Sequence, residues 1–360
     1  MSLAQPKRIL IIKLRHHGDV LLSTPVVDAL KTRFPDCEID MLVYAGTGQL
    51  IADNPQIAQI FTIDRNWKKL GVFKQLACEK NLLSKLKARD YDWAFNLSDQ
   101  WRAAIIAKLC ARCSVGLDCI KRDGFWWRFC HDFINHELDT SHHIVENQLN
   151  ILAPLIQPED VADAKVRLWV AQDARESMRQ KLREQGWNGE DYVLMHPGAR
   201  WHFKCWEDGK NAAIVQLLLN SGQNVVLTAS PDTVEQYMLQ EIIGRLNIPE
   251  GRKVYVLSGC LSLRELAAAI EGAKLFVGVD SAPMHIAAAL DKPQIALFGA
   301  SWVDKWRPYS EQAEVIYAGD YAELPHPDSI DINDPTRLLK AIPLQDVWDR
   351  ISAKLEALEA

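Results

Sequence analysis

A short stretch in the second half of the chain combines residue types that bind anions. Asp280 and Ser281 are both good helix N-caps, and they follow the apolar run Lys274–Val277, which predicts a buried strand. Pro283 stands where a first-turn proline belongs, ahead of an alanine-rich helix that ends near Leu290. Where a strand stops and a helix starts, the helix dipole and free backbone N–H groups converge. We interpret this turn as a diphosphate site, with an ordinary strand–helix junction as the alternative.

One further residue of this stretch could serve the same site. His285 lies about one turn into the expected helix, from where it can face the same cleft as Asp280. The diphosphate that we expect here is that of a sugar nucleotide.

A second polar cluster supplies cations. Arg200 and Lys204 lie in the loop His196–Trp206, which follows another predicted strand. Cations opposite a helix N-terminus complement a diphosphate and stabilise it as it leaves. The alternative is solvated surface charge, but the Gly198 turn and the aromatic residues of the loop disfavour it, even if Trp201 and its neighbours only anchor the loop.

The third candidate is a carboxylate near the N-terminus. Asp19 follows the first predicted strand, on a loop that would face a cleft. Transfer of a sugar to an acceptor hydroxyl needs a base within hydrogen-bond reach, and a carboxylate can serve. Asp19 could equally cap a helix that starts at Val20. His16 and His17 are rivals for the role of base.

These candidates lie in a chain of 360 residues, which is long enough for two domains. It is 48% hydrophobic and 24% charged, with a formal net charge of -6 and a pI near 6.0, which argues against bulk nucleic-acid binding. No run of about 18 apolar residues predicts a transmembrane helix. The first residues lack a signal-peptide layout, so we expect a cytoplasmic protein whose eight cysteines are reduced.

Several known motifs are missing or weak. Without G-x-G-x-x-G after a first strand, and without a P-loop, a dinucleotide-dependent dehydrogenase and a P-loop NTPase are disfavoured. We recognise no D-x-D pair of the kind that binds a divalent ion in metal-dependent transferases. We therefore expect no metal site and no required cofactor. Cys110 and Cys113 form a C-x-x-C, with Cys119 and Cys130 nearby, but the second pair is not closely spaced, so buried thiols are favoured over zinc.

Short apolar runs alternate with amphipathic stretches along both halves, which is typical of parallel sheets wound with helices. The expected strands are 8–14, 38–44, 59–63, 91–97, 192–195, 224–228, 254–257, 274–277 and, as the last clear one, 294–298. The expected helices are 20–34, 70–89, 99–109, 141–155, 206–220, 232–246, one capped by Ser262 and Glu265, and 345–358.

Two segments are expected to be irregular. Residues 115–143 are rich in aromatic and basic side chains and predict a loop that either folds over a substrate or packs on its domain. Residues 160–185 are expected to form the linker. The predicted fold is α/β, with an N-terminal Rossmann-like domain (1–170), a C-terminal Rossmann-like domain (171–342) facing it across a cleft, and a C-terminal helix (343–360) that returns towards the first domain.

Three motifs in order give a resemblance over nearly the whole chain. Lys13-x5-Asp19, His196-Pro-Gly-Ala-Arg…Lys204…Trp206 and Val279-Asp-Ser-Ala-Pro-Met-His285 resemble the lipopolysaccharide core heptosyltransferases of glycosyltransferase family 9. The resemblance implies the two-domain glycosyltransferase B (GT-B) fold and an inverting transfer of heptose from ADP-heptose to the inner core. The second motif is most similar to the type III enzymes, which add the branch heptose to the second heptose. Acceptor choice of type I or II stays open.

By this resemblance the N-terminal domain binds the acceptor and the C-terminal domain binds the ADP-sugar. Asp19 is then the general base. The donor-binding residues would be Arg200, Lys204, Leu261 beside the adenine, Asp280, Ser281, Ala282 and His285. The acceptor is an anionic, phosphorylated, lipid-linked oligosaccharide, and its candidate partners are Lys13, Arg15, Arg102, Lys121, Arg122 and Arg128.

The resemblance also implies peripheral contact with the cytoplasmic face of the inner membrane, without insertion. Two other classes stay open from the residues alone. One is a sugar-nucleotide 2-epimerase, which shares the fold and needs no lipid acceptor. The other is a non-catalytic sugar-nucleotide binding protein.

Overall fold

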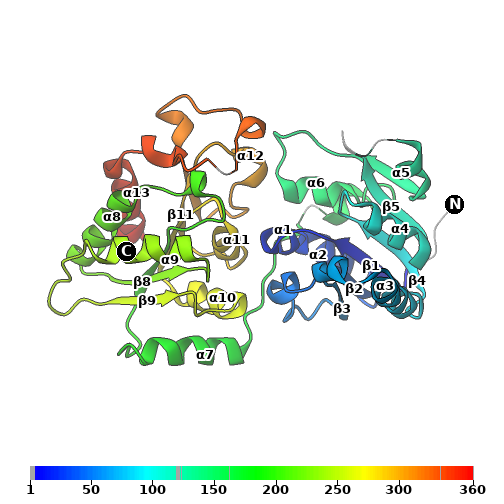
Figure 1. Cartoon of the computed structure of the whole chain (residues 1–360), viewed down its shortest axis with the longest axis horizontal. Helices are drawn as coiled ribbons and strands as arrows, with labels where there is room; N and C mark the ends of the chain where they lie inside the picture. Colours follow the sequence, from blue (N-terminus) through cyan, green and yellow to red (C-terminus); the bar gives the residue numbers. More distant parts are fainter. Residues whose placement is uncertain (1–4, 119–121, 123, 162, 333, 360) are drawn as a thin grey trace. The chain divides into compact units, whose positions relative to one another are not determined.

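The computed structural model describes residues 5–118, 122, 124–161, 163–332 and 334–359. The chain forms two compact units, Met1–Trp169 and Val170–Ala360, and each is built on one six-stranded sheet (Figure 1). Within the described ranges, no helix has the length and apolar character needed to cross a membrane.

The first sheet has the strand order β3-β2-β1-β4-β5-β6, and its neighbouring strands run parallel. Its strands are β1 (Arg8–Lys13), β2 (Glu38–Tyr44), β3 (Gln59–Ile63), β4 (Tyr91–Asn96), β5 (Ala111–Asp118) and β6 (Phe133–His136). The described helices of this unit are α1 (His17–Leu21), α2 (Thr24–Arg33), α3 (Val72–Lys87), α4 (Trp101–Cys110), α5 (Phe125–Phe129) and α6 (Ile144–Asn150).

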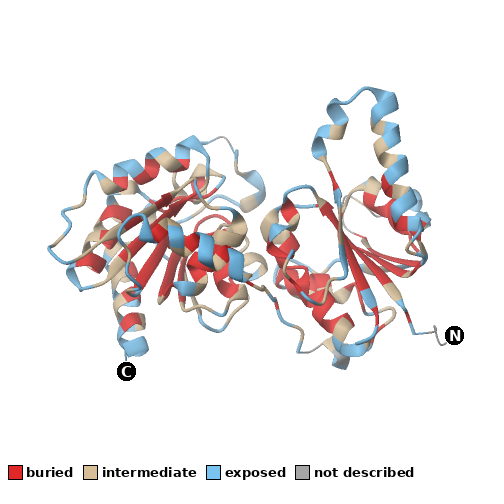
Figure 2. Ribbon diagram, turned by 90° about the horizontal axis from the view of Figure 1, so that it is seen from below, coloured by how far each residue is buried: buried red, intermediate tan, exposed pale blue. Residues whose placement is uncertain are grey.

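Helices cover both faces of this sheet, and the central strand β1 serves two apolar cores. Its side chains alternate, so that Ile9 and Ile11 pack with α2 in one core while Leu10 and Ile12 pack with α3 and α4 in the other. Figure 2 shows the buried strands between the half-exposed helices. This burial on both sides explains why β1 is apolar at consecutive positions.

The second sheet has the order β12-β11-β10-β7-β8-β9, again with parallel neighbours. Its strands are β7 (Tyr192–His196), β8 (Asn224–Ala229), β9 (Val254–Ser258), β10 (Leu275–Val279), β11 (Gln294–Phe298) and β12 (Ala313–Tyr317). Its described helices are α7 (Gln172–Arg183), α8 (Asp208–Asn220), α9 (Thr233–Ile243), α10 (Leu263–Gly272), α11 (Ala282–Ala289), α12 (Val303–Trp306) and α13 (Leu344–Glu359).

The expected parallel α/β architecture is confirmed, as are the expected strands, with small differences at their ends. The capping box of α10 is also confirmed, because the Ser262 hydroxyl accepts from the N–H of Glu265 while the Glu265 carboxylate accepts from the N–H of Ser262. The single helix expected at 20–34 is instead two helices, α1 and α2. They are separated near Ser23, and Pro25 lies in the first turn of α2.

The expectation of an irregular segment at 115–143 is wrong for much of its length, since it contains the end of β5, all of α5 and all of β6. β6 has only four residues and pairs with one neighbour at the sheet edge, so it lacks a long apolar run. Likewise β12, another edge strand, lies beyond the last strand that the sequence predicts.

The expected linker at 160–185 contains helix α7. Half of this helix is charged, and only Ala174, Met178 and Leu182, one position per turn, are buried. Arg175 adds a bidentate ion pair with Glu271 of α10, at 2.6 and 2.7 Å. A helix with so narrow an apolar stripe is easily taken for a polar linker.

The C-terminal helix predicted at 345–358 is confirmed as α13. Val347, Ile351 and Leu355 form its buried stripe, and they belong to the core that also contains side chains of α8 and α9. This buried face packs in the second unit, because that is where the stripe finds apolar partners. That the helix also returns towards the first domain stays a prediction from the sequence.

Candidate functional site

Each sheet has a point at which the winding of the chain reverses. It lies between β1 and β4 in the first sheet and between β7 and β10 in the second. Loops that follow such neighbouring strands diverge, and the space beyond their carboxyl ends is where open α/β sheets bind ligands. The loops after β1, β7 and β10 carry the three motifs of the sequence, so both switch points are candidate sites.

At the switch point of the second sheet, Lys204 meets Asp280. Nζ of Lys204 lies 2.5 Å from Oδ2 of Asp280, and the Ser301 hydroxyl donates a hydrogen bond of 2.7 Å to the same oxygen. The three residues follow β7, β10 and β11, which are adjacent in the sheet. Sheet topology therefore brings together the two predicted residues and adds Ser301, which no sequence motif marks.

Asp280 does not cap α11. The N-cap position belongs to Ser281, whose hydroxyl makes no capping hydrogen bond and is buried without a partner among the described residues. The Asp280 carboxylate is engaged by Lys204 and Ser301 instead. Pro283 stands in the first turn, as predicted, and Ala282 opens the helix. The first N–H groups of a helix have no acceptor within it, so this end of α11 presents donors and a partial positive charge beside Asp280.

The loop that carries Lys204 passes close to helix α9 and needs Gly198. A Cβ at this position would come within 2.6 Å of the Glu235 carboxylate on α9. Beyond it the rings of Trp201 and Phe203 stack, with centroids 6.1 Å apart, and Nζ of Lys204 lies 5.1 Å from the centre of the Trp201 ring. The ring face thus offers the ammonium group a second favourable contact.

Arg337 fixes the far end of the same loop. It donates two hydrogen bonds to the Asp208 carboxylate, at 2.6 and 2.9 Å, one of 2.8 Å to the carbonyl of Trp206, and one of 3.0 Å to His202. Burial, and then the Arg337 charge, lower the pKa of His202, which keeps its ring neutral and able to accept. The sequence did not indicate Arg337, because it lies more than 120 residues from its partners.

At the switch point of the first sheet, four polar contacts join the loops after β1 and β4. The Lys13 amine donates to the carbonyl of Leu97 at 3.2 Å, and Arg15 pairs with Asp99 at 3.0 Å. The Ser98 hydroxyl accepts from the N–H of Leu14 at 2.7 Å, and Gln100 donates to the Leu14 carbonyl at 2.7 Å. The loop that carries Asp19 is therefore fixed at its start to the neighbouring strand.

Asp19 itself lies in the first turn of α1. Its carboxylate accepts from the N–H of His16 at 3.3 Å, in a capping box. The sequence predicts Asp19 as a possible N-cap before Val20, but the helix begins three residues earlier, at His17. The capping contact uses one of its two oxygens, which leaves acceptor capacity for a second donor.

Two ionisable neighbours of Asp19 are perturbed. Lys13 is only 4% exposed, and burial lowers its pKa from 10.5 to about 8, although the charge of Asp19 acts in the opposite direction. Burial, followed by the charges of His16 and Arg65, lowers the pKa of His17. At neutral pH the first switch point thus holds a buried ammonium group near a carboxylate.

The described cations that are predicted to meet the acceptor are each bound by a partner within the protein. Arg102 on α4 pairs with Glu79 on α3 at 2.5 Å. Arg122 donates to the carbonyl of Asp99 at 2.8 Å and lies over the Trp101 ring, and Arg128 pairs with Asp118 at 3.2 Å. Lys121 lies outside the described residues. Arg15 and Arg122 both bond Asp99 and so lie, with Lys13, at the first switch point.

Three other predicted positions are less informative. His285 is buried within α11, and Arg200 is exposed. Leu261 is half-buried just before α10.

The thiols of the cysteine cluster are not arranged as metal ligands in the described part of the chain. There, no three or more His, Cys, Asp or Glu side chains gather in a way that could hold a metal ion. Cys110 and Cys113 are buried, and burial raises the pKa of each to about 11. Cys119 lies outside the described residues.

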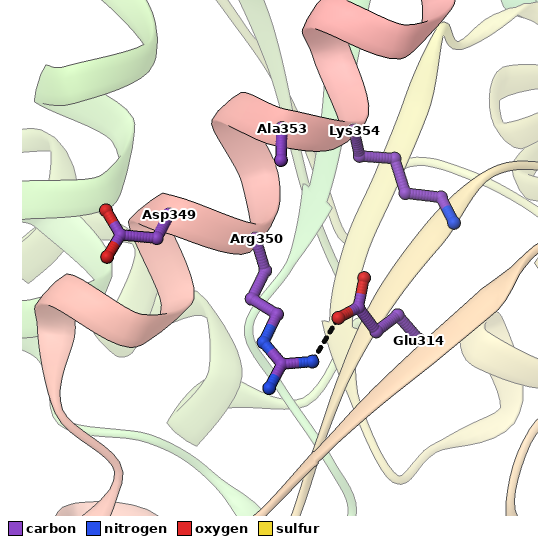
Figure 3. Close-up of a pocket in the computed structure, with 5 residues that line it drawn as sticks. All are labelled: Glu314, Asp349, Arg350, Ala353 and Lys354. Carbon is purple, nitrogen blue, oxygen red and sulfur yellow. Dashed lines mark hydrogen bonds and ion pairs between the residues drawn. The ribbon is translucent and has the colours of Figure 1, made fainter.

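A shallow pocket of about 420 Å³ lies elsewhere on the second unit, between α13 and β12 (Figure 3). Arg350 and Glu314 form an ion pair across it, and Asp349 and Lys354 lie at its sides. Its lining follows no strand end at the switch point, so we do not assign the ligand site to it.

With both switch points described, comparison with known proteins assigns the family. The profile of glycosyltransferase family 9 (heptosyltransferase) matches residues 80–336. The chain belongs to this heptosyltransferase family. A curated member, lipopolysaccharide heptosyltransferase 3 of Escherichia coli, is 38% identical over 93% of this chain and 95% of its own length.

Solved structures of the heptosyltransferase family share the fold. A family 9 glycosyltransferase from Veillonella parvula superposes with a TM-score of 0.83, at 21% identity, over 99% of both chains. An Escherichia coli heptosyltransferase with ADP-2-deoxy-2-fluoro heptose superposes with a TM-score of 0.71, at 20% identity, over 96% of this chain and 99% of its own chain. The fold is GT-B, and family membership makes the protein a glycosyltransferase rather than an epimerase or a non-catalytic binding protein.

Proposed function

We propose that this heptosyltransferase transfers heptose from ADP-heptose, with inversion, to a heptose of the lipopolysaccharide inner core. The meeting of Lys204, Asp280 and the start of α11 at one switch point carries the proposal, because it combines a cation, a helix N-terminus and a carboxylate in the way a sugar diphosphate requires. We further propose that the first unit binds the acceptor and the second the donor, with domains at 1–170 and 171–342 and α13 as a C-terminal element at 343–360.

The donor's diphosphate is assigned to the N-terminus of α11. There the N–H groups of Ser281 and Ala282 would donate to its oxygens, while Lys204, with Arg200 nearby, would neutralise the charge that develops as ADP leaves. Asp280 would accept hydroxyl groups of the heptose. The adenine is assigned to Leu261, and His285 supports the turn from within the helix.

The base is assigned to Asp19. It would take the proton from the acceptor hydroxyl as that oxygen attacks the anomeric carbon, whose bond to the ADP oxygen then breaks. His16 and His17 are the alternative bases. His17 suits proton abstraction at neutral pH, because its lowered pKa keeps the ring neutral.

The acceptor is proposed to be the phosphorylated, lipid-linked inner core, with the second heptose as the branch site. This choice of type III over types I and II is supported by the 38% identity with the type 3 enzyme, against 25% or less with the curated type 1 and type 2 relatives. Lys13, Arg15, Arg102, Lys121, Arg122 and Arg128 are the proposed acceptor contacts. We place the enzyme in the cytoplasm, at the inner membrane surface, and propose that it needs no metal or other cofactor.

The test is heptose transfer from ADP-heptose to purified inner-core acceptors that are truncated at successive sugars. We expect product only with the acceptor that ends at the second heptose. Asp19→Ala should be folded, bind ADP as the wild type does, and lose about 100-fold or more in kcat, as expected for loss of a general base.

His16→Ala and His17→Ala are the matched controls, and each should keep most of the activity. No transfer to any acceptor would refute the heptosyltransferase assignment for this chain. Full activity of Asp19→Ala, with a large loss in His16→Ala or His17→Ala, would leave the transfer but move the base to that histidine.

A further inference from the structure

An arm of the first unit, residues 64–80, projects away from its sheet. It comprises the 3-10 helix η2 (Arg65–Lys69) and the first two turns of α3. In Figure 2 it is the helical segment that stands out from the first unit, and it is coloured mostly as exposed, with some intermediate positions. Every residue from Lys68 to Lys74 is exposed, so the tip of the arm is not part of either apolar core.

The tip of the arm is apolar although it is exposed. Phe73 is 89% exposed, Val72 70% and Leu76 59%, and Leu70 just before them is also exposed. Single exposed apolar residues are common, but four within seven positions form a patch, and such patches mark binding surfaces. Because Leu76 follows Phe73 by three positions and Val72 by four on α3, the three side chains share one side of the helix.

Cations surround this apolar tip. The arm contains five cationic residues and two acidic ones, in a chain whose net charge is -6. Of the two acids, Glu79 is paired with Arg102. Lys68, Lys69 and Lys74, all exposed, directly flank the apolar residues. The arm is therefore locally positive where the whole protein is negative.

We infer that the arm docks on the surface of a lipid bilayer that contains anionic headgroups. Its apolar tip would enter the boundary between headgroups and acyl chains while the lysines contact the phosphates, which is how interfacial amphipathic segments bind. A protein partner fits less well, because lysine is depleted from protein–protein interfaces. The inference rests on the proposed function, in which the acceptor is anchored in a membrane.

The position of the arm within its unit suits this role. It follows directly from the carboxyl end of β3, and helices that follow parallel strands start at the same edge at which those strands end. Asp19 follows the carboxyl end of β1 in the same sheet. Docking of the arm would bring the edge that carries the proposed base towards the membrane that holds the acceptor.

The test is co-flotation of the purified full-length protein with vesicles. Wild type should float with vesicles of phosphatidylethanolamine and phosphatidylglycerol, and much less with phosphatidylcholine alone or at high salt. The double variant Phe73→Ser/Leu76→Ser should bind these vesicles at least about tenfold more weakly than wild type, because two inserted side chains are lost. Each of Lys68→Gln, Lys69→Gln and Lys74→Gln should weaken binding about fivefold.

The matched control is Ile248→Ser/Leu358→Ser, which removes two exposed apolar side chains from the second unit and should float as wild type does. Since Phe73 and Leu76 are exposed, their variant should melt at the wild-type temperature. Equal flotation of that variant and wild type would overturn the inference. So would a wild-type oligomer that dissociates in the Phe73→Ser/Leu76→Ser variant, since a second copy would then cover the tip.

Transfer to a deacylated acceptor separates this inference from the proposed function. The arm variant should use the soluble, deacylated acceptor at the wild-type rate and lose activity only with the acceptor in vesicles. Loss of activity on both acceptors would assign the arm to the acceptor sugars and overturn membrane docking. If wild type transfers no heptose at all but floats through its arm, the proposed function fails and the docking surface stands.

Discussion

Lys204 and Asp280 are 76 residues apart in the chain, yet their charged groups lie 2.5 Å apart at the start of α11. Both side chains are largely shielded from solvent, at 16% and 7% exposure. The pair therefore holds an ammonium group in a fixed position beside a helix N-terminus, where a diphosphate would meet two sources of positive charge together.

Replacement of Lys204 by alanine should weaken ADP binding by about 10- to 100-fold, because one charge-assisted contact to the diphosphate is lost. Isothermal titration calorimetry with ADP measures this directly. Lys204→Arg should recover part of the affinity. Lys354→Ala is the control, since this lysine lies on α13 beside the separate pocket of Figure 3, and it should bind ADP as wild type does. Unchanged affinity in Lys204→Ala would place the diphosphate elsewhere.

Asp280→Asn distinguishes a sugar contact from a role in holding Lys204. If the carboxylate accepts hydroxyl groups of the heptose, the amide should leave ADP affinity within about twofold and weaken ADP-heptose binding by about tenfold, as expected for one hydrogen bond to a charged group. Competition between ADP and a non-transferable ADP-heptose analogue gives both values. Equal losses for the two ligands would instead show that Asp280 acts only through Lys204.

Arg337→Ala should destabilise the second unit by about 2 kcal/mol, because it leaves the partly buried Asp208 carboxylate and the Trp206 carbonyl without their donor. Urea unfolding measures the loss. ADP affinity should also fall, since the loop that carries Lys204 loses its anchor, and Arg337→Lys should restore little because it cannot make the bidentate contact. A stable variant with normal affinity would show that the loop holds its shape unaided.

Because the Lys13 amine is buried, the stability of the protein should vary with pH in the alkaline range. Its pKa is about 8 in the folded protein and 10.5 in the unfolded chain, so between these values the unfolded state binds more protons. As pH rises from 8 to 10.5, the free energy of unfolding of wild type should therefore rise by up to about 3 kcal/mol relative to that of Lys13→Met. Below pH 8 the difference between the two free energies should be constant. Urea unfolding of both proteins over this range measures the gain. A difference that does not vary with pH would contradict the lowered pKa.

The sequence by itself determined the central strands, most of the helices and the loops that carry the candidate site. Strands such as β1 are local apolar runs buried on both faces. β7 ends directly before the loop that carries Arg200 and Lys204, and β10 ends directly before the polar residues 280–281. These signals are contained in a few consecutive residues. Edge strands β6 and β12 and the charged helix α7 lack them, because each is stabilised mainly by a neighbour from another part of the chain.

Only the tertiary structure decided which side chains meet. Ser301 joins Asp280 because β11 lies beside β10, and Arg337 reaches Asp208 across 129 residues. The same packing pairs Arg102 with Glu79 and exposes Phe73 at the tip of an arm. Residue type fixes what a group can donate, accept or bury, but its partner is fixed by strand order and helix packing, which arise from contacts over long separations in the sequence.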